Sequence, residues 1–216
     1  MGLVAWLIAE AGVMQGMARK LLQWGLLALA GCGAVAAPSP ATAHDGEVLF
    51  TVYRAQNATD RLADIVRTVS ADFRDSQLTA ATLGYAYHRS PNARWELEAQ
   101  LVKHSGMQHH WETNAVVAVR WMHFPWDRWL DTRFAFGEGL SYAWKTPPLE
   151  PRGDEPGEGE SSRLLNYLLL EWEFVVPGQP EWSSFLRLHH RSGVNGLFGG
   201  VQGGSNFVGV GVRYTF

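Results

Sequence analysis

The stretch NFVGVGVRYTF, residues 206–216, decides the fold of this chain. Its apolar side chains recur at every second position, from Val208 through Val210, Val212 and Tyr214 to Phe216. Strict alternation is typical of a β-strand with one face in an apolar medium and the other face in a polar one. The stretch therefore predicts a strand that lies between two media.

A terminal aromatic residue preceded by apolar residues at every second position resembles the assembly signal of bacterial outer-membrane β-barrels. The resemblance implies location in the bacterial outer membrane and recognition of this last strand by the barrel assembly machinery. The membrane restricts the fold further, because a chain without spanning helices must close its backbone hydrogen bonds between strands.

The beginning of the chain has the pattern of an export signal. Arg19 and Lys20 precede an apolar run, and the small residues 41–43 follow it. This pattern predicts a signal peptide over residues 1–43, cleaved after Ala43, with Met17 as a possible start, and a barrel domain over residues 44–216. A second interpretation remains open: residues 29–32 (LAGC) have the form of a lipoprotein box, in which Cys32 would be lipidated.

Composition narrows the function classes. Cys32 is the single cysteine of 216 residues, so the folded part has no disulfide and no thiol chemistry. The net charge of −3 does not indicate nucleic acid as a partner. After the signal there is no apolar run of about 20 residues, the length that a spanning helix needs.

Alternation and turn residues predict an all-β fold, an eight-stranded antiparallel transmembrane β-barrel. The expected strands are residues 47–57, 78–88, 95–105, 110–122, 132–143, 163–176, 182–192 and 205–216. Odd-numbered connections face outside in such barrels and include the longest ones, here 58–77 and 145–162. The first of these is predicted to be a surface loop, with one helical turn at its apolar residues as the alternative.

A barrel of eight strands fills its interior with side chains and forms no wide pore. Charged residues that alternate with the apolar ones are therefore expected to form a network of ion pairs inside the barrel. These residues are Glu96, Glu98, Arg120, Arg133, Glu171, Glu173 and Arg187.

The strongest chemical signal is the stretch 189–193 (HHRSG) at the end of the seventh expected strand. Alternation continues the outward face of that strand to His190 and Ser192, and the outward face of the last strand to Asn206. Residues two apart on a strand are separated by about 6.6 Å and neighbouring strands by about 4.8 Å. The three side chains are thus expected to meet on the outer wall, at the height of the outer-leaflet headgroups.

A serine, a histidine and an orienting polar group are the requirements of nucleophilic acyl transfer. The Gly-rich loop that follows the serine offers backbone N–H groups, and we expect an oxyanion hole from Gly193 or Asn195. Arg191 is expected to contact substrate phosphates, as are Lys145 and the loop histidines. This mechanism implies no metal or organic cofactor. His104, His109 and His110 suggest a metal site, but they lack the spacing of a defined metal motif.

A short outer-membrane barrel with His-x-Ser on its penultimate strand resembles the PagL-type lipid A 3-O-deacylases. The resemblance is loose over the barrel and specific over about the last 30 residues. It implies a serine esterase acting on the lipid A of lipopolysaccharide, with Ser192 as the nucleophile and His190 as the base. Asn206 stands where the family has a glutamate, and a neutral amide stabilises a charged imidazole less well than a carboxylate does.

A non-catalytic alternative stays open. Basic and amphipathic side chains are favoured at the membrane interface without any catalysis. In that interpretation His189, His190 and Arg191 form a collar that contacts lipopolysaccharide, and the barrel binds this lipid or a surface partner through its long loops. The acidic connection with Glu150, Asp154, Glu155, Glu158 and Glu160 favours this alternative.

Overall fold

The structure is a computed structural model that describes residues 46–150 and 161–216. The expected signal peptide, its cleavage site after Ala43 and the alternative lipidation site at Cys32 lie outside these residues. So does most of the acidic connection, residues 151–160.

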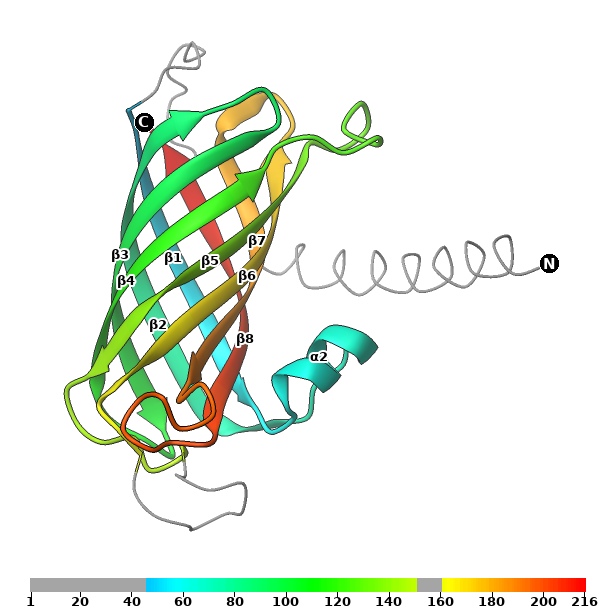
Figure 1. The fold of residues 1–216 in the computed structure, drawn as a ribbon. Coiled ribbons are helices and arrows are strands. Elements are labelled where there is room, and N and C mark those ends of the chain that lie inside the picture. Colours follow the sequence, from blue (N-terminus) through cyan, green and yellow to red (C-terminus); the bar gives the residue numbers. More distant parts are fainter. Residues whose placement is uncertain (1–45, 151–160) are drawn as a thin grey trace. The chain divides into compact units, whose positions relative to one another are not determined.

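Eight antiparallel strands form a closed barrel in which each strand pairs with its neighbour in the chain and β1 pairs with β8 (Figure 1). The strands are β1 Glu47–Ala58, β2 Phe73–Arg89, β3 Ala93–Gly106, β4 Trp111–Trp121, β5 Thr132–Ala143, β6 Leu164–Val176, β7 Gln179–Ser192 and β8 Gly204–Thr215. The predicted fold class is confirmed in its architecture: the protein is an all-β, antiparallel closed barrel of eight strands.

Among the described residues, no helix is long and apolar enough to cross a membrane.

Two features of the first connection differ from the prediction. β2 begins at Phe73 rather than at Leu78, because the pairing with β1 continues beyond a bulge between Gln56 and Ala58. The added residues are mostly polar and carry no alternation signal. The predicted surface loop contains a short helix, α2 Leu62–Thr68, which ends where Val69 adopts a left-handed conformation.

The interior is filled with paired charges, as predicted. Glu171 lies within ion-pair distance of three guanidinium groups, those of Arg120 (2.7 Å), Arg187 (2.6 Å) and Arg213 (2.8 Å). All four side chains are fully or almost fully buried. Glu96, Glu98 and Glu173 complete the network, and Arg133 joins it at one edge through Glu173. Such a network excludes a wide aqueous channel through the barrel.

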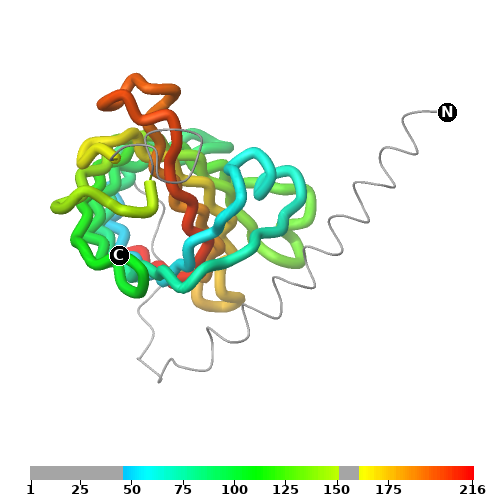
Figure 2. Tube along the Cα trace, turned by 90° about the horizontal axis from the view of Figure 1, so that it is seen from below, coloured from blue at the N-terminus to red at the C-terminus, as the bar shows by residue number. Residues whose placement is uncertain are grey.

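The two ends of the barrel differ in their connections. One end carries the β1–β2 connection with α2, the described ends of the β5–β6 connection and the loop 193–203. The β1–β2 connection and the loop 193–203 stand out in the end-on view (Figure 2). We call this the long-loop end, and long loops mark the extracellular side of bacterial barrels. The opposite end holds tighter turns such as Pro177–Gly178, where Gly178 has a φ of 77°.

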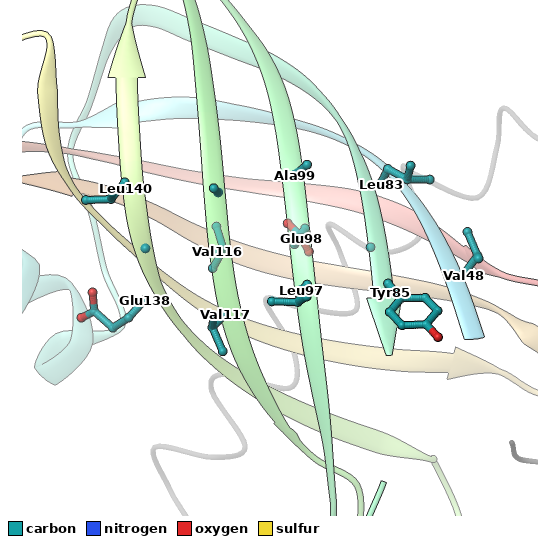
Figure 3. A pocket seen from close by; sticks show the side chains of 13 residues that line it. Val48, Leu83, Tyr85, Leu97, Glu98, Ala99, Val116, Val117, Glu138 and Leu140 are labelled. Atoms are coloured by element: carbon teal, nitrogen blue, oxygen red, sulfur yellow. The ribbon is translucent and has the colours of Figure 1, made fainter. Parts of the chain in front are cut away.

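The outer wall, meaning the side chains that point away from the barrel axis, is mainly apolar. A groove of about 530 Å³ crosses β2 to β5 on this wall (Figure 3). Large side chains such as Leu83, Leu97 and Leu140 flank it, while Ala99 and Ala115 leave space between them. An apolar groove on this wall is suited to contact with lipid chains rather than with water.

Candidate functional site on the outer wall

The structure brings His190 and Asn206 together at the long-loop end. His190 on β7 lies directly opposite Asn206 on β8, and Ser192 lies opposite Gly204. His190 and Ser192 are partly exposed, whereas their neighbours His189 and Arg191 are buried. The alternation argument therefore placed His190, Ser192 and Asn206 on the correct face.

The imidazole of His190 is held in one tautomer. Its Nδ1 lies 2.7 Å from Oδ1 of Asn206, while Nδ2 of Asn206 donates to the carbonyl oxygen of Asp60 at 2.8 Å. A carbonyl only accepts, so the bond to Asp60 fixes which end of the amide faces His190. His190 must then donate from Nδ1, and its Nε2 carries the lone pair that a general base uses.

Asn206 is itself fixed from two sides. Its amide is tied to the β1–β2 connection through Asp60, and its backbone carbonyl accepts a hydrogen bond from Nδ2 of Asn57 at 3.0 Å. Asn206 is only 7% exposed. The orienting residue of the site is therefore preorganised rather than free to rotate.

Ser192 has a different local partner. Its Oγ accepts a hydrogen bond from the N–H of Val194 at 3.1 Å. In the described residues, no hydrogen bond joins Ser192 to His190. Ser192 and His190 share a face of β7 at a spacing of two residues, so they are adjacent but not engaged.

The loop after Ser192 is tightly closed, and this decides which N–H groups are available. The N–H of Gly193 donates to the carbonyl of Gly203 at 3.0 Å. The prediction that Gly193 is a free oxyanion donor is therefore wrong. A Cβ at Gly193 would lie 1.9 Å from the carbonyl oxygen of Val201, which explains the glycine. Asn195, with a φ of 51°, is exposed, and its N–H has no partner among the described residues.

Arg191 and His189 do not lie on the outer wall, which corrects two predictions. Both side chains are 0% exposed and point into the barrel, because they alternate with His190 and Ser192. Arg191 pairs with Glu150 at 2.6 Å and donates to Oγ of Ser141. Neither residue can contact substrate phosphates or form a collar there. Glu150 is likewise a buried lumen residue rather than a charge on an acidic surface loop.

The predicted contact between loop histidines and phosphates is also wrong for two of the three residues. His104 and His110 are buried inside the barrel mouth and stack with ring centroids 4.2 Å apart, whereas His109 is exposed. Burial lowers the pKa of His110 to about 3, with the neighbouring His104 as the next cause, so this ring is uncharged at neutral pH.

Two polar residues of the outer wall were missed. Asn166 on β6 lies opposite Ser192, and its Nδ2 donates to Oε2 of Glu138 on β5 at 3.0 Å. Glu138 is exposed on the outer wall beside the apolar groove (Figure 3). Its alternation with the outward-facing Phe134 and Phe136 is the signal that would have identified it, since outward charges in a membrane strand are rare.

Comparison with known proteins gives only distant structural likenesses. No family model matches the chain, and no curated protein matches it. Among solved structures, the outer-membrane enzyme PagL is similar with a TM-score of 0.48 and 10% identity, over 77% of this chain and 98% of PagL. Neisserial surface protein A gives 0.45 and 11%, over 79% and 97%. The N-terminal barrel of Pseudomonas aeruginosa OprF gives 0.44 and 12%, over 79% and 99%.

The three structures include an enzyme and barrels whose descriptions name no activity, and their low identity does not distinguish between these functions. The chain is thus similar to small outer-membrane barrels as a class. Its function has to be argued from its own residues.

Proposed function

We propose that the protein is an outer-membrane serine esterase that removes an ester-linked acyl chain from the lipid A of lipopolysaccharide. The observation that carries this proposal is the orientation of His190 by Asn206, with Nδ1 as the donor and Nε2 left as the base. The likeness of the His-x-Ser arrangement to the lipid A 3-O-deacylases supports the 3 position as the site of cleavage.

In the proposed reaction, Ser192 leaves its contact with the Val194 N–H, and Oγ approaches Nε2 of His190. Oγ attacks the ester carbonyl carbon, while its proton passes to Nε2. The tetrahedral intermediate then releases the sugar alcohol, which takes the proton from Nε2. A water molecule, deprotonated by the same Nε2, hydrolyses the acyl-serine and frees the fatty acid.

The developing oxyanion needs a donor near Ser192, and the Asn195 N–H is the candidate with no competing partner in the described part of the chain. Asn206 orients the ring without adding a negative charge. Because the imidazolium that forms is then less stabilised, we expect slower turnover than a carboxylate in this position would support.

The substrate is proposed to lie in the outer leaflet, against the barrel. Its acyl chains run along the outward apolar residues of β7 and β8, such as Leu186 and Val210, which lie opposite each other. Lys145, exposed at the long-loop end, is the proposed phosphate contact. Lipopolysaccharide and the assembly machinery that reads β8 are the partners in this proposal, and the mechanism uses no metal or organic cofactor.

The proposal is tested with protein purified in detergent and incubated with lipid A, with released fatty acid as the readout. Ser192→Ala should abolish release. Ser184→Ala is the matched control, because Ser184 lies on the same face of β7 but far from the long-loop end, and should leave release unchanged. Equal release by both variants would contradict a role for Ser192 in catalysis.

A non-catalytic barrel that binds lipopolysaccharide is the second candidate. The hydrogen bond from the Val194 N–H to Ser192, in place of one from Ser192 to His190, favours it. In that case the purified wild-type protein would retain lipid A without releasing any fatty acid, and Ser192→Ala would bind as the wild type does.

A further inference from the structure

A second polar cluster lies inside the barrel mouth, away from the outer wall. It consists of His104 on β3, His110 in the β3–β4 connection and Glu112 on β4. One ligand atom from each of these residues lies within 4.8 Å of the others. All three side chains are buried, with exposed fractions of 1%, 4% and 0%.

The hairpin geometry explains why these residues meet. The N–H of His104 donates to the carbonyl of His110 at 3.0 Å, so the two residues face each other at the start of the β3–β4 connection. Glu112 follows His110 by two residues and points to the same interior side. The three donors therefore come from one hairpin, formed by β3, β4 and their short connection, rather than from separate loops.

One donor atom in this cluster is buried and not engaged. Nε2 of His110 has no hydrogen-bond partner among the described residues, whereas Oε1 of Glu112 lies 3.0 Å from Nε2 of His189. A buried polar atom without a partner costs about 1–3 kcal/mol, so such atoms are rare and call for a ligand or another explanation. The remaining carboxylate oxygen, Oε2 of Glu112, lies 2.9 Å from Nε2 of His104.

Neighbouring side chains are placed to orient the donors. Nδ1 of His104 lies 3.0 Å from the side-chain amide of Gln108, whose Oε1 is buried and has no partner in the described ranges. Turning that amide over presents Oε1 to Nδ1–H and leaves the lone pair of Nε2 free for a cation. Nε2 of His189 lies 3.0 Å from Oε1 of Glu112. Supporting contacts of this kind are typical around metal ligands.

Local charge also favours a cation. Arg191, whose Nε lies 3.6 Å from Glu112, has its own strong partner in Glu150, with Nη1 2.6 Å from that carboxylate. Arg191 thus faces two carboxylates, and one negative charge of this group is left for a cation to neutralise. Two imidazoles and one carboxylate form a donor set that Zn²⁺ uses in proteins, with a fourth position left for water.

We propose that His104, His110 and Glu112 bind one divalent transition-metal ion, with Zn²⁺ as the best-fitting ion. Zn–N and Zn–O distances near 2.1 Å in a tetrahedron need donors about 3.4 Å from each other, so the side chains must adjust from their present spacing of up to 4.8 Å. The ion joins the β3–β4 connection to the two strands. The site is independent of the proposed esterase reaction on the outer wall.

The test uses the protein purified in detergent, with Zn²⁺ measured by titration calorimetry and Co²⁺ followed by its visible absorption. Wild-type protein should bind one ion per chain, and Co²⁺ should show the intense bands of a tetrahedral site. His110→Ala should weaken binding by more than about 100-fold, beyond the 10–100-fold typical of losing a supporting residue. His109→Ala is the matched control, since the exposed His109 is adjacent and should leave binding unchanged.

Folding of each variant is checked by its heat-dependent mobility in gel electrophoresis. If His110→Ala does not fold, Glu112→Gln keeps the shape of the side chain and should likewise abolish stoichiometric binding. Absence of one-to-one Zn²⁺ binding by the wild type would overturn the proposal. Equal loss in His109→Ala and His110→Ala would also overturn it, because the ion would then be held by surface histidines.

Discussion

Asn206 accepts a hydrogen bond from Nδ1 of His190 at 2.7 Å while it donates to the carbonyl of Asp60. The second bond gives the first its direction, because an amide that donates on one side must present its oxygen on the other. In the proposed reaction, Asn206 supplies the orienting function of a catalytic acid without its charge. Orientation and charge stabilisation are separable in this site, and substitutions at Asn206 measure each one.

Asn206→Asp restores an anionic partner for His190 in a side chain of equal size. We expect turnover to rise about 10-fold, equivalent to about 1.4 kcal/mol of activation free energy. Rates of fatty-acid release by wild type, Asn206→Asp and Asn206→Leu provide the measurement. Asn206→Leu should fall well below the wild type. If Asn206→Asp falls as far as Asn206→Leu, the lost bond to Asp60 outweighs the added charge and the account of Asn206 is wrong.

The adjacent histidines should respond in opposite ways. His190→Ala removes the proposed base and should lower the rate of release by roughly 10²–10⁴-fold. His189→Ala removes a buried ring that contacts Tyr53 and Tyr167, so it should lower the free energy of unfolding by about 1–3 kcal/mol while activity persists. Release assays combined with urea unfolding in lipid vesicles check both. Loss of activity in His189→Ala alone would place the chemistry inside the barrel.

Gly193 is required by the close approach of the loop 193–203 to the end of β7. Gly193→Ala puts a Cβ 1.9 Å from the carbonyl oxygen of Val201, so the loop must open. We expect faster hydrogen exchange at the N–H groups of the loop and loss of fatty-acid release. Gly200→Ala is the comparison, since no atom lies within 4 Å of its added Cβ, although its φ of 77° adds strain. A rigid, active Gly193→Ala protein would refute this role.

The interior network should tolerate loss of its central carboxylate poorly. Glu171→Gln leaves three buried guanidinium groups short of one negative charge, and we expect the free energy of unfolding to fall by about 3–5 kcal/mol. Glu138→Gln, at an exposed carboxylate with one hydrogen bond to Asn166, should cost about 1 kcal/mol or less. Urea unfolding in lipid vesicles measures both. Similar losses in the two variants would contradict the central position of Glu171.

Alternation predicted most of the barrel because a membrane imposes a two-residue period on every spanning strand. It identified the strand faces, the interior charges and the outward position of His190, Ser192 and Asn206. It failed at the start of β2, where residues 73–77 pair with neighbouring strands beyond the apolar region and are mostly polar. Strand ends outside the lipid carry no such period.

Arg191 shows a different kind of error. The same alternation that faces His190 and Ser192 outward faces Arg191 inward, so the predicted phosphate contact contradicted the argument that located the site. Glu138 was missed because the alternation was not applied to it. Phe134 and Phe136 face outward on the same strand, so Glu138 had to face outward as well. The partner of Arg191 was not predictable in this way, because Glu150 reaches the lumen from a connection without a period.

The histidines of the β3–β4 connection were set aside because their spacing in sequence matches no metal motif. The ligand geometry comes instead from strand pairing, which brings His104 against His110 and places Glu112 beside them. To predict this cluster from the sequence, one would need to know which residue of β3 pairs with which residue of β4 and its connection.

Mass spectrometry of lipid A tests the central claim most directly. Lipid A is isolated from cells expressing the wild-type chain, Ser192→Ala or Ser184→Ala, each shown to be folded in the outer membrane. We expect lipid A to lose the mass of one hydroxyacyl chain with the wild type and with Ser184→Ala, and to stay intact with Ser192→Ala. Identical lipid A in all three strains would contradict the esterase and leave a barrel whose His190 and Ser192 only contact lipid.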